Sequence, residues 1–147
     1  SQVFDSIHSQ IMQNMEFKNT YPRIIGETGG KNFHFVDESC ISNLDEVVKM
    51  TIESAFNYSG QKCSACSIMY VPEDMVDNLN DSFNQHLKFY QNNLQNYGVV
   101  NQEAFDRISN IYHNLIDDKD IKFLFDASNT VSPFFRFITP AIGIING

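Results

Sequence analysis

The spacing of hydrophobic positions changes along the chain between a helical and a strand pattern. Near the start, apolar residues recur every three or four positions, at Val3, Phe4, Ile7, Ile11 and Met15. This spacing predicts an amphipathic helix that ends before Tyr21 and Pro22. Ile24 and Ile25 predict a short strand, a glycine-rich turn follows over residues 26–30, and residues 32–36 predict a second strand.

The same alternation continues through the rest of the chain. Ser42 and Asp45 have the spacing of a capping box in front of an apolar helical face, and Gly60 is placed to terminate that helix. The later predicted elements are a strand over 67–71, helices that begin at Pro72 and near Asn101, and strands over 121–125 and 136–145. Alternating strands and helices predict an α/β fold, layered, with a largely parallel sheet and flanking helices.

Composition narrows the range of partners. With 147 residues, 42% of them hydrophobic, the chain can bury one sizeable core and form one domain or part of one. A formal net charge of −8 without a run of Lys or Arg argues against a nucleic-acid surface. No apolar run approaches the roughly 18 to 20 residues that cross a bilayer, which argues against a membrane partner. Small molecules are therefore the expected partners.

Two short segments carry groups suited to covalent chemistry. Residues 60–65 place the thiol of Cys63 directly after a predicted helix, beside small residues and beside Lys62, which could favour the thiolate. Residues 26–31 place the carboxylate of Glu27 among glycines, where the backbone can approach a ligand closely. A thiolate nucleophile and a carboxylate base can take a carbonyl compound through a covalent thioester and then hydrolyse it.

Other interpretations of these residues compete with catalysis. Without their neighbours, Cys63 would be read as a buried structural cysteine and Glu27 as an exposed turn carboxylate. Cys63 and Cys66 also form a Cys-x-x-Cys pair, typical of zinc or redox sites. A structural zinc would need two more ligands from Cys40 and scattered histidines, and a redox pair is expected to open a helix rather than follow one. Cys66 is accordingly expected in the core of the next strand, and His34 on one face of its strand.

Residues 21–36 read Tyr-Pro-Arg-Ile-Ile-Gly-Glu-Thr-Gly-Gly-Lys-Asn-Phe-His-Phe-Val, and residues 54–66 read Ser-Ala-Phe-Asn-Tyr-Ser-Gly-Gln-Lys-Cys-Ser-Ala-Cys. The first resembles the catalytic-glutamate segment, and the second the nucleophile segment, of Δ1-pyrroline-5-carboxylate dehydrogenases, a branch of the aldehyde dehydrogenases. The two motifs occur in the family's order and separation. The resemblance covers about the first half of the chain and weakens beyond Pro72, where residues 97–100 and 137–140 look like degraded family motifs.

The resemblance implies a role for each matching residue. Cys63 would attack the aldehyde of L-glutamate γ-semialdehyde, hydride would pass to NAD, and Glu27 would activate the water that hydrolyses the thioester. The backbone N–H of Cys63 would supply part of the oxyanion hole, and Ser64 would contact the substrate. Thr28 and Gly29 would lie against the nicotinamide. The family further implies an oxidoreductase of proline catabolism that forms homo-oligomers in the mitochondrial matrix.

The chain also departs from the family pattern. It contains no glycine fingerprint of a dinucleotide-binding domain and no upstream oxyanion-hole asparagine, so residues 1–147 are expected to be a partial catalytic domain that is inactive alone. The rival hypothesis is a catalytically silent descendant that serves as an interaction or assembly module. A zinc or redox module remains a second rival.

Overall fold

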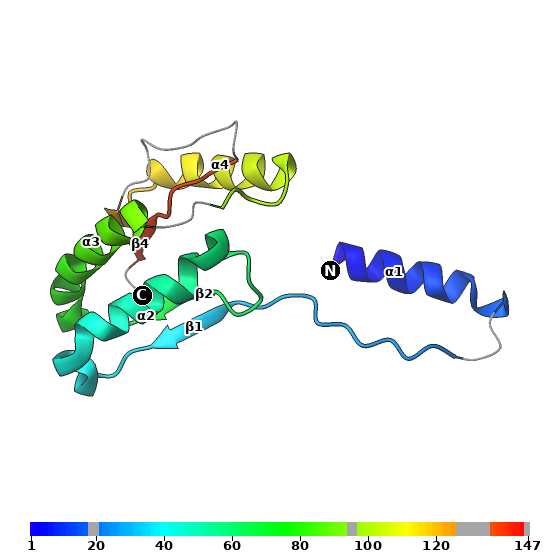
Figure 1. Cartoon of the computed structure of the whole chain (residues 1–147), viewed down its shortest axis with the longest axis horizontal. Coiled ribbons are helices and arrows are strands. Elements are labelled where there is room, and N and C mark those ends of the chain that lie inside the picture. The colour runs from blue at the N-terminus through cyan, green and yellow to red at the C-terminus, as the bar shows by residue number, and fades with distance from the viewer. Residues whose placement is uncertain (18–20, 94–96, 126–135, 146–147) are drawn as a thin grey trace. The chain divides into compact units, whose positions relative to one another are not determined.

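The computed structural model describes residues 1–17, 21–93, 97–125 and 136–145, and the chain divides into two compact units, Ser1–Lys31 and Asn32–Gly147 (Figure 1). The first unit contains helix α1 (Gln2–Gln13) and a 3-10 turn, η1 (Met15–Phe17). The Ser1 hydroxyl caps α1 by accepting a hydrogen bond from the N–H of Phe4 at 3.4 Å. The helix predicted from the apolar spacing is thus confirmed.

The strand predicted at Ile24 and Ile25 is wrong, because residues 21–31 form no regular structure. Ile25 is 95% exposed. Two β-branched residues make a strand only when a neighbouring strand accepts and donates the ladder hydrogen bonds, and the described residues of this unit contain no such neighbour.

The second unit holds the remaining helices and strands. The helices are α2 (Leu44–Phe56), α3 (Val76–Asn93) and α4 (Gln102–Ile116), with 3-10 turns η2 (Glu38–Asn43), η3 (Asn57–Gly60) and η4 (Glu73–Met75). Strands β1 (Asn32–Phe35) and β2 (Cys66–Tyr70) pair in parallel, whereas β3 (Ile121–Phe125) and β4 (Ile142–Ile145) pair antiparallel. Among the described helices, none combines the length and the apolar character needed to span a membrane.

The core of this unit lies where α2 and α3 pack together (Figure 1). Aliphatic residues at helical spacing line the facing sides of the two helices, as periodicity predicts. The buried side chains of the cluster are Val36, Leu44, Val48, Ile52, Met75, Leu79, Phe83 and Leu87. This packing anchors α2, whose C-terminal end leads directly into the segment that carries Cys63.

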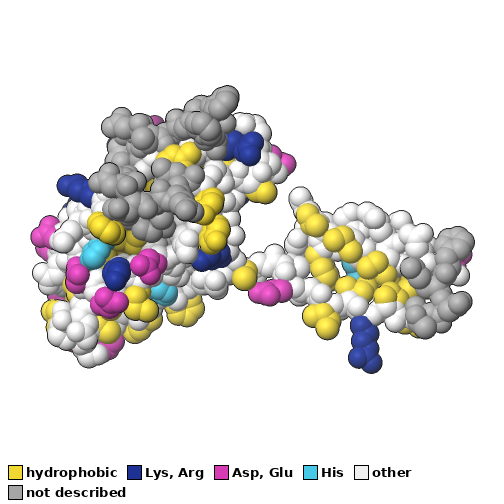
Figure 2. Space-filling model, viewed as in Figure 1, with side chains coloured by type: hydrophobic (Ala, Val, Ile, Leu, Met, Phe, Trp, Pro, Cys, Tyr) yellow, Lys and Arg dark blue, Asp and Glu magenta, His cyan; other side chains and the backbone are white. Residues whose placement is uncertain are grey.

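The β1–β2 pair has one covered and one exposed face. On the covered face, Nδ1 of His34 lies 2.8 Å from the hydroxyl of Thr51, a buried residue of α2. His34 therefore lies on one face of its strand with a hydrogen-bond partner, as predicted. The exposed face consists of Phe33, Phe35, Ile68 and Tyr70. Figure 2 shows hydrophobic side chains at the surface of this unit. Parallel sheets are usually covered on both faces, so this exposed face is unusual.

The mixed α/β class is confirmed, and so is parallel pairing for β1 and β2, but the second pair of strands differs from prediction. The strand predicted over 136–145 is confined to β4 at its C-terminal end. Arg136 has a φ of 50°, a left-handed conformation that an extended strand cannot contain. Because β4 runs antiparallel to β3, the described sheets are not mainly parallel.

The predicted capping box is also wrong. The N-cap of α2 is Asn43, whose side chain makes no capping hydrogen bond, because η2 continues directly into the helix. The Asp45 carboxylate instead accepts hydrogen bonds from the Ser82 hydroxyl and from Nε2 of His86, each at 2.8 Å. Both donors belong to α3, so Asp45 links the two core helices.

This link predicts how stability depends on pH. The hydrogen bonds from Ser82 and then His86 lower the pKa of Asp45 below its ordinary value of 3.8. A lowered pKa in the folded state stabilises the fold above pH 3.8, and this contribution is lost as the pH falls through the lowered value. Asp45→Asn should therefore reduce the free energy of unfolding at pH 7, and its difference from the unchanged chain should shrink in acid.

Urea unfolding at several pH values measures this difference. Asp81→Asn, at an exposed position of α3, is the matched control and should show a smaller effect at neutral pH. An Asp45→Asn effect of constant size from pH 7 down to pH 2 would contradict this account.

Candidate active site

The backbone after α2 reverses direction through three consecutive residues in the left-handed region. Tyr58, Ser59 and Gly60 have φ values of 56°, 58° and 70°. A Cβ added to Gly60 would lie 2.9 Å from the carbonyl oxygen of Ala55, so this position has no room for a side chain. The sequence prediction that Gly60 ends the helix is right in part: α2 ends at Phe56, and η3 completes the reversal.

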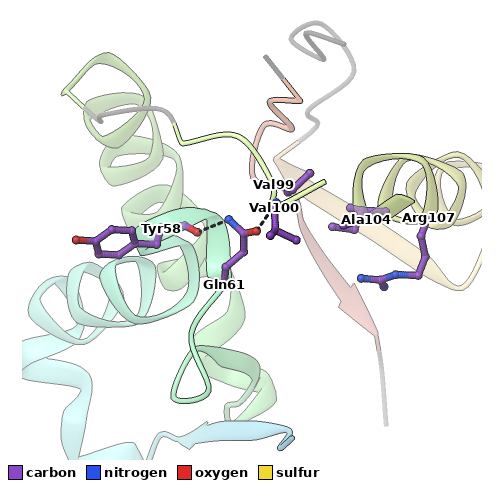
Figure 3. Close-up of a pocket in the computed structure, with 7 residues that line it drawn as sticks. Tyr58, Gln61, Val99, Val100, Ala104 and Arg107 are labelled. Atoms are coloured by element: carbon purple, nitrogen blue, oxygen red, sulfur yellow. Dashed lines mark hydrogen bonds between the residues drawn. The ribbon is translucent and has the colours of Figure 1, made fainter. Parts of the chain in front are cut away.

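The side chain of Gln61 ties this reversal to the segment after α3. Its Nε2 donates to the carbonyl oxygens of Tyr58 at 3.0 Å and Gly98 at 3.2 Å. Its Oε1 accepts from the backbone N–H of Val100 at 2.8 Å (Figure 3). Both hydrogens and the oxygen of the Gln61 amide are thereby bonded. They join two segments that are 37 or more positions apart in the sequence.

Aromatic stacking reinforces the same connection. The rings of Tyr58 and Tyr97 stack with centroids 4.9 Å apart, and the hydroxyl of Ser59 donates to the Tyr97 carbonyl. The ammonium of Lys62 lies 5.2 Å from the centroid of the Tyr58 ring, a cation–π distance. Lys62 therefore has an aromatic partner, and its expected effect on the neighbouring thiol stays a prediction.

Cys63 and Ser64 occupy the two central positions of a hydrogen-bonded turn. The N–H of Ala65 donates to the carbonyl oxygen of Lys62 at 3.2 Å, which closes the turn over residues 62–65. Both central residues are exposed, while Ala65 is buried. Within the part of the chain that the structure describes, the backbone N–H groups of Cys63 and Ser64 donate no hydrogen bond. The turn thus presents an exposed cysteine and two N–H groups that have no hydrogen-bond partner among the described residues.

Asn32 holds this turn from the start of β1. Its side-chain nitrogen donates to the carbonyl oxygen of Cys63 at 2.6 Å and to that of Ala65 at 3.0 Å. The ladder is irregular at this point, since Asn32 pairs with Cys66 whereas Phe33 already pairs with Ile68. The extra residue on β2 is a bulge, a feature that often re-aims side chains next to functional sites.

The three cysteines are in different environments. Cys63 is exposed, Cys40 is half-buried, and Cys66 is buried in β2, where its thiol donates to the carbonyl oxygen of Ile68 at 3.2 Å. The prediction that Cys66 belongs to the core of the strand is confirmed. Across residues 1–17, 21–93, 97–125 and 136–145, no group of three or more His, Cys, Asp or Glu side chains could hold a metal ion.

A pocket of about 630 Å³ adjoins the segment that leads into the turn (Figure 3). Its lining is mostly apolar, with one amide and one cationic side chain: Tyr58, Gln61, Val99, Val100, Ala104, Arg107 and Ile108. Cys63 and Ser64 are not part of the lining, so the pocket lies beside the route to the turn rather than at the thiol.

The other predicted site residues belong to the first unit. Glu27, Thr28 and Gly29 lie in the irregular segment 21–31, and all three are exposed. Their pairing with Cys63 and Ser64 across the two units stays a prediction that rests on the family resemblance.

Sequence reasoning missed two residues that shape the turn. In the sequence, Asn32 stands out only as part of a strand motif, and Gln61 only as part of the nucleophile segment. Both occur inside the two motifs, so their position was a signal, but their contacts join residues 31 to 39 positions apart. Hydrophobic periodicity carries no information about such contacts.

Comparison with known proteins identifies the class. The profile of the aldehyde dehydrogenase family matches residues 5–135. The chain therefore belongs to the aldehyde dehydrogenase family. The fold agrees, because a crystal structure of the Δ-pyrroline-5-carboxylate dehydrogenase from Mycobacterium tuberculosis matches with a TM-score of 0.77 and 23% identity, over 100% of this chain and 28% of that one.

Two relatives that are similar in sequence have the same name. The mitochondrial Δ1-pyrroline-5-carboxylate dehydrogenase of Rattus norvegicus is 40% identical over 113 residues, which are 72% of this chain and 20% of the rat protein. The Homo sapiens enzyme of the same name is 50% identical over 73 residues, 50% of this chain and 13% of its own length. The chain thus spans about a fifth or less of these two relatives.

The exposure of the three thiols predicts their order of modification. Brief treatment of the folded chain with iodoacetamide should alkylate Cys63 well before Cys40 or Cys66, because access precedes reaction. Peptide mapping by mass spectrometry measures the order, and labelling in urea is the control in which the three should react at similar rates. Preferential labelling of Cys40 or Cys66 in the folded chain would count against the site.

Proposed function

We propose that this chain carries the nucleophile and general-base segments of an NAD-dependent enzyme that oxidises L-glutamate γ-semialdehyde to glutamate in proline catabolism. The observation that carries the proposal is the exposed thiol of Cys63 on a turn whose N–H groups at Cys63 and Ser64 are free within the described residues. Membership of the family and the names of the rat and human relatives support the choice of reaction and substrate.

This geometry supports the chemistry that we propose for Cys63. The thiolate attacks the aldehyde carbon, a carbon–sulfur bond forms, and the carbonyl electron pair moves onto oxygen. The free N–H of Cys63 donates to that oxyanion, and Ser64 contacts the substrate beside it. After oxidation the acyl group remains on sulfur as a thioester. Glu27 takes a proton from water as the water attacks the thioester carbon, and glutamate leaves with Cys63 restored.

Bound NAD would accept the hydride that leaves the substrate carbon. The segment proposed to contact the nicotinamide is open to an approaching ring. Thr28 is exposed, and a Cβ added to Gly29 would meet no atom within 4 Å. Gly29 has a φ of 151°, a backbone conformation that favours glycine. A flat ring could therefore approach the backbone here. The Mycobacterium tuberculosis Δ-pyrroline-5-carboxylate dehydrogenase has been crystallised bound with NAD, which supports the choice of cofactor.

The compartment and the assembly of the complete protein are also proposed. The rat and human relatives are named as mitochondrial, which supports the mitochondrial matrix as the compartment. Assembly into a homo-oligomer is proposed from the family resemblance. Residues 1–147 are proposed to be part of a catalytic domain, with the dinucleotide-binding residues supplied from elsewhere.

The general base can be tested in a chimera of the rat relative whose matching segment is replaced by residues 21–66 of this chain. Glu27→Gln should leave formation of the thioester largely intact and slow its hydrolysis by about a hundredfold or more, because an amide cannot take a proton from water. Rapid-quench kinetics should then show a burst of NADH followed by slow turnover. Unchanged steady-state turnover would remove Glu27 from the mechanism, and Glu38→Gln, in η2, serves as the control.

The 147-residue chain alone should form no NADH from glutamate semialdehyde at a measurable rate, although its thiol reacts. Hydride transfer requires the nicotinamide to be held against the substrate carbon, and the sequence has no glycine fingerprint that could bind the pyrophosphate. Loss of one oxyanion donor, the family's upstream asparagine, costs a further hundredfold or so. Absorbance at the NADH band measures the rate. Robust turnover by the isolated chain would show that its cofactor site lies within these residues.

A further inference from the structure

We infer that Asn32 is a positioning residue for the nucleophile turn: it holds the Cys63–Ser64 and Ala65–Cys66 peptide groups, so that the N–H groups of the turn that have no partner among the described residues are aimed at an oxyanion. The inference rests on the proposed function, in which Cys63 forms the covalent adduct. It concerns residues of the second unit alone, so its geometry is complete there.

The chemistry of the contact requires an asparagine. A side-chain amide nitrogen has two hydrogens, and each reaches one carbonyl oxygen, at 2.6 Å for Cys63 and 3.0 Å for Ala65. Aspartate has the same shape but would place acceptors against two acceptors. Serine can donate to at most one of the two. The site therefore discriminates among side chains by donor count rather than by size.

Because the peptide group is planar, a hydrogen bond to its carbonyl oxygen also fixes the direction of its N–H. In a trans peptide the C=O and N–H point in opposite directions, so fixing one fixes the other. The Ala65 N–H holds the Lys62 carbonyl, which orients the N–H of Cys63 away from the interior of the turn. Asn32 holds the Cys63 carbonyl, which orients the N–H of Ser64 away from β1. Two hydrogen bonds thus set the directions of both free donors that flank the reactive sulfur.

The position of Asn32 explains why it can act as a fixed support. It is the first residue of β1 and pairs with Cys66, the first residue of β2, so both ends of the clamp are tied to the same ladder. Strand β1 is fixed in turn to α2 through the contact between His34 and Thr51. A side chain held by a strand loses less freedom on bonding than one held by a loop, which favours a preorganised turn.

The test compares two reactions of Cys63 in the purified 147-residue chain. Iodoacetamide alkylates the thiolate without forming an oxyanion. With p-nitrophenyl acetate the thiolate attacks the ester carbonyl, the electron pair moves onto oxygen, and collapse expels p-nitrophenolate and leaves an acetyl thioester. The ratio of acylation to alkylation rates isolates oxyanion stabilisation, because changes in access or in thiolate concentration affect both reactions.

In the unchanged chain this ratio should be higher when the protein is folded than in urea. Asn32→Asp and Asn32→Ser should each lower the folded ratio, by about tenfold, because donor alignment contributes only when charge develops on oxygen. The serine variant separates lost donors from added charge. Asn84→Asp removes a similar amide from α3, where it donates to the Asn80 carbonyl at 3.0 Å, and should leave the ratio unchanged.

The outcomes separate the inference from the proposed function. In one outcome, both Asn32 variants fold, as circular dichroism shows, and keep the raised ratio of acylation to alkylation rates. This outcome overturns the role of Asn32 and leaves the proposed function standing. A ratio no higher in the folded chain than in urea overturns the oxyanion-binding turn itself. If a variant fails to fold, hydrogen exchange of the backbone amides in the unchanged chain is the remaining test. An oriented, solvent-facing N–H of Ser64 should exchange faster than the N–H of Ala65, because the latter donates to the Lys62 carbonyl.

Discussion

The left-handed backbone of Tyr58, Ser59 and Gly60 is the constraint on which the candidate site depends. The chain turns back after α2 at these residues, so that Cys63 lies just before the start of β2 and not along the helix axis. Tyr58 and Ser59 are not glycines, and each costs about 1 to 3 kcal/mol in this conformation. The three hydrogen bonds of Gln61 and the stacking of Tyr58 on Tyr97 offset that cost.

Three supports stabilise the turn that carries Cys63, and they follow one another from the core to the surface. Packing of α2 on α3 fixes the helix that precedes the reversal, Gln61 ties the reversal to residues 98–100, and Asn32 ties the turn to β1. Each support comes from a different part of the sequence. The exposed thiol itself contributes nothing to this network, so strain at the reversal and exposure of Cys63 are consistent with a site kept for chemistry rather than for stability.

Local patterns predicted most of the helices and strands of the second unit. Helices α3 and α4 and strands β1 and β2 follow from spacing and flanking residues. The failures lie where distant residues decide: Asp45 bonds residues 37 and 41 positions away instead of capping α2, and Ile24 and Ile25 have no partner strand among the described residues. Asn32 and Gln61 were missed for the same reason. Of the three left-handed residues, only Gly60 is marked as such by its residue type.

The central claim is that Cys63, on its supported turn, adds to an aldehyde carbon. The most direct measurement is ¹³C NMR of the chain mixed with glutamate semialdehyde labelled at the aldehyde carbon. The account predicts a protein-bound resonance of a tetrahedral carbon attached to sulfur, absent in the Cys63→Ser variant and present in Cys40→Ser. No such resonance in the unchanged chain, or the same resonance in Cys63→Ser, would contradict it.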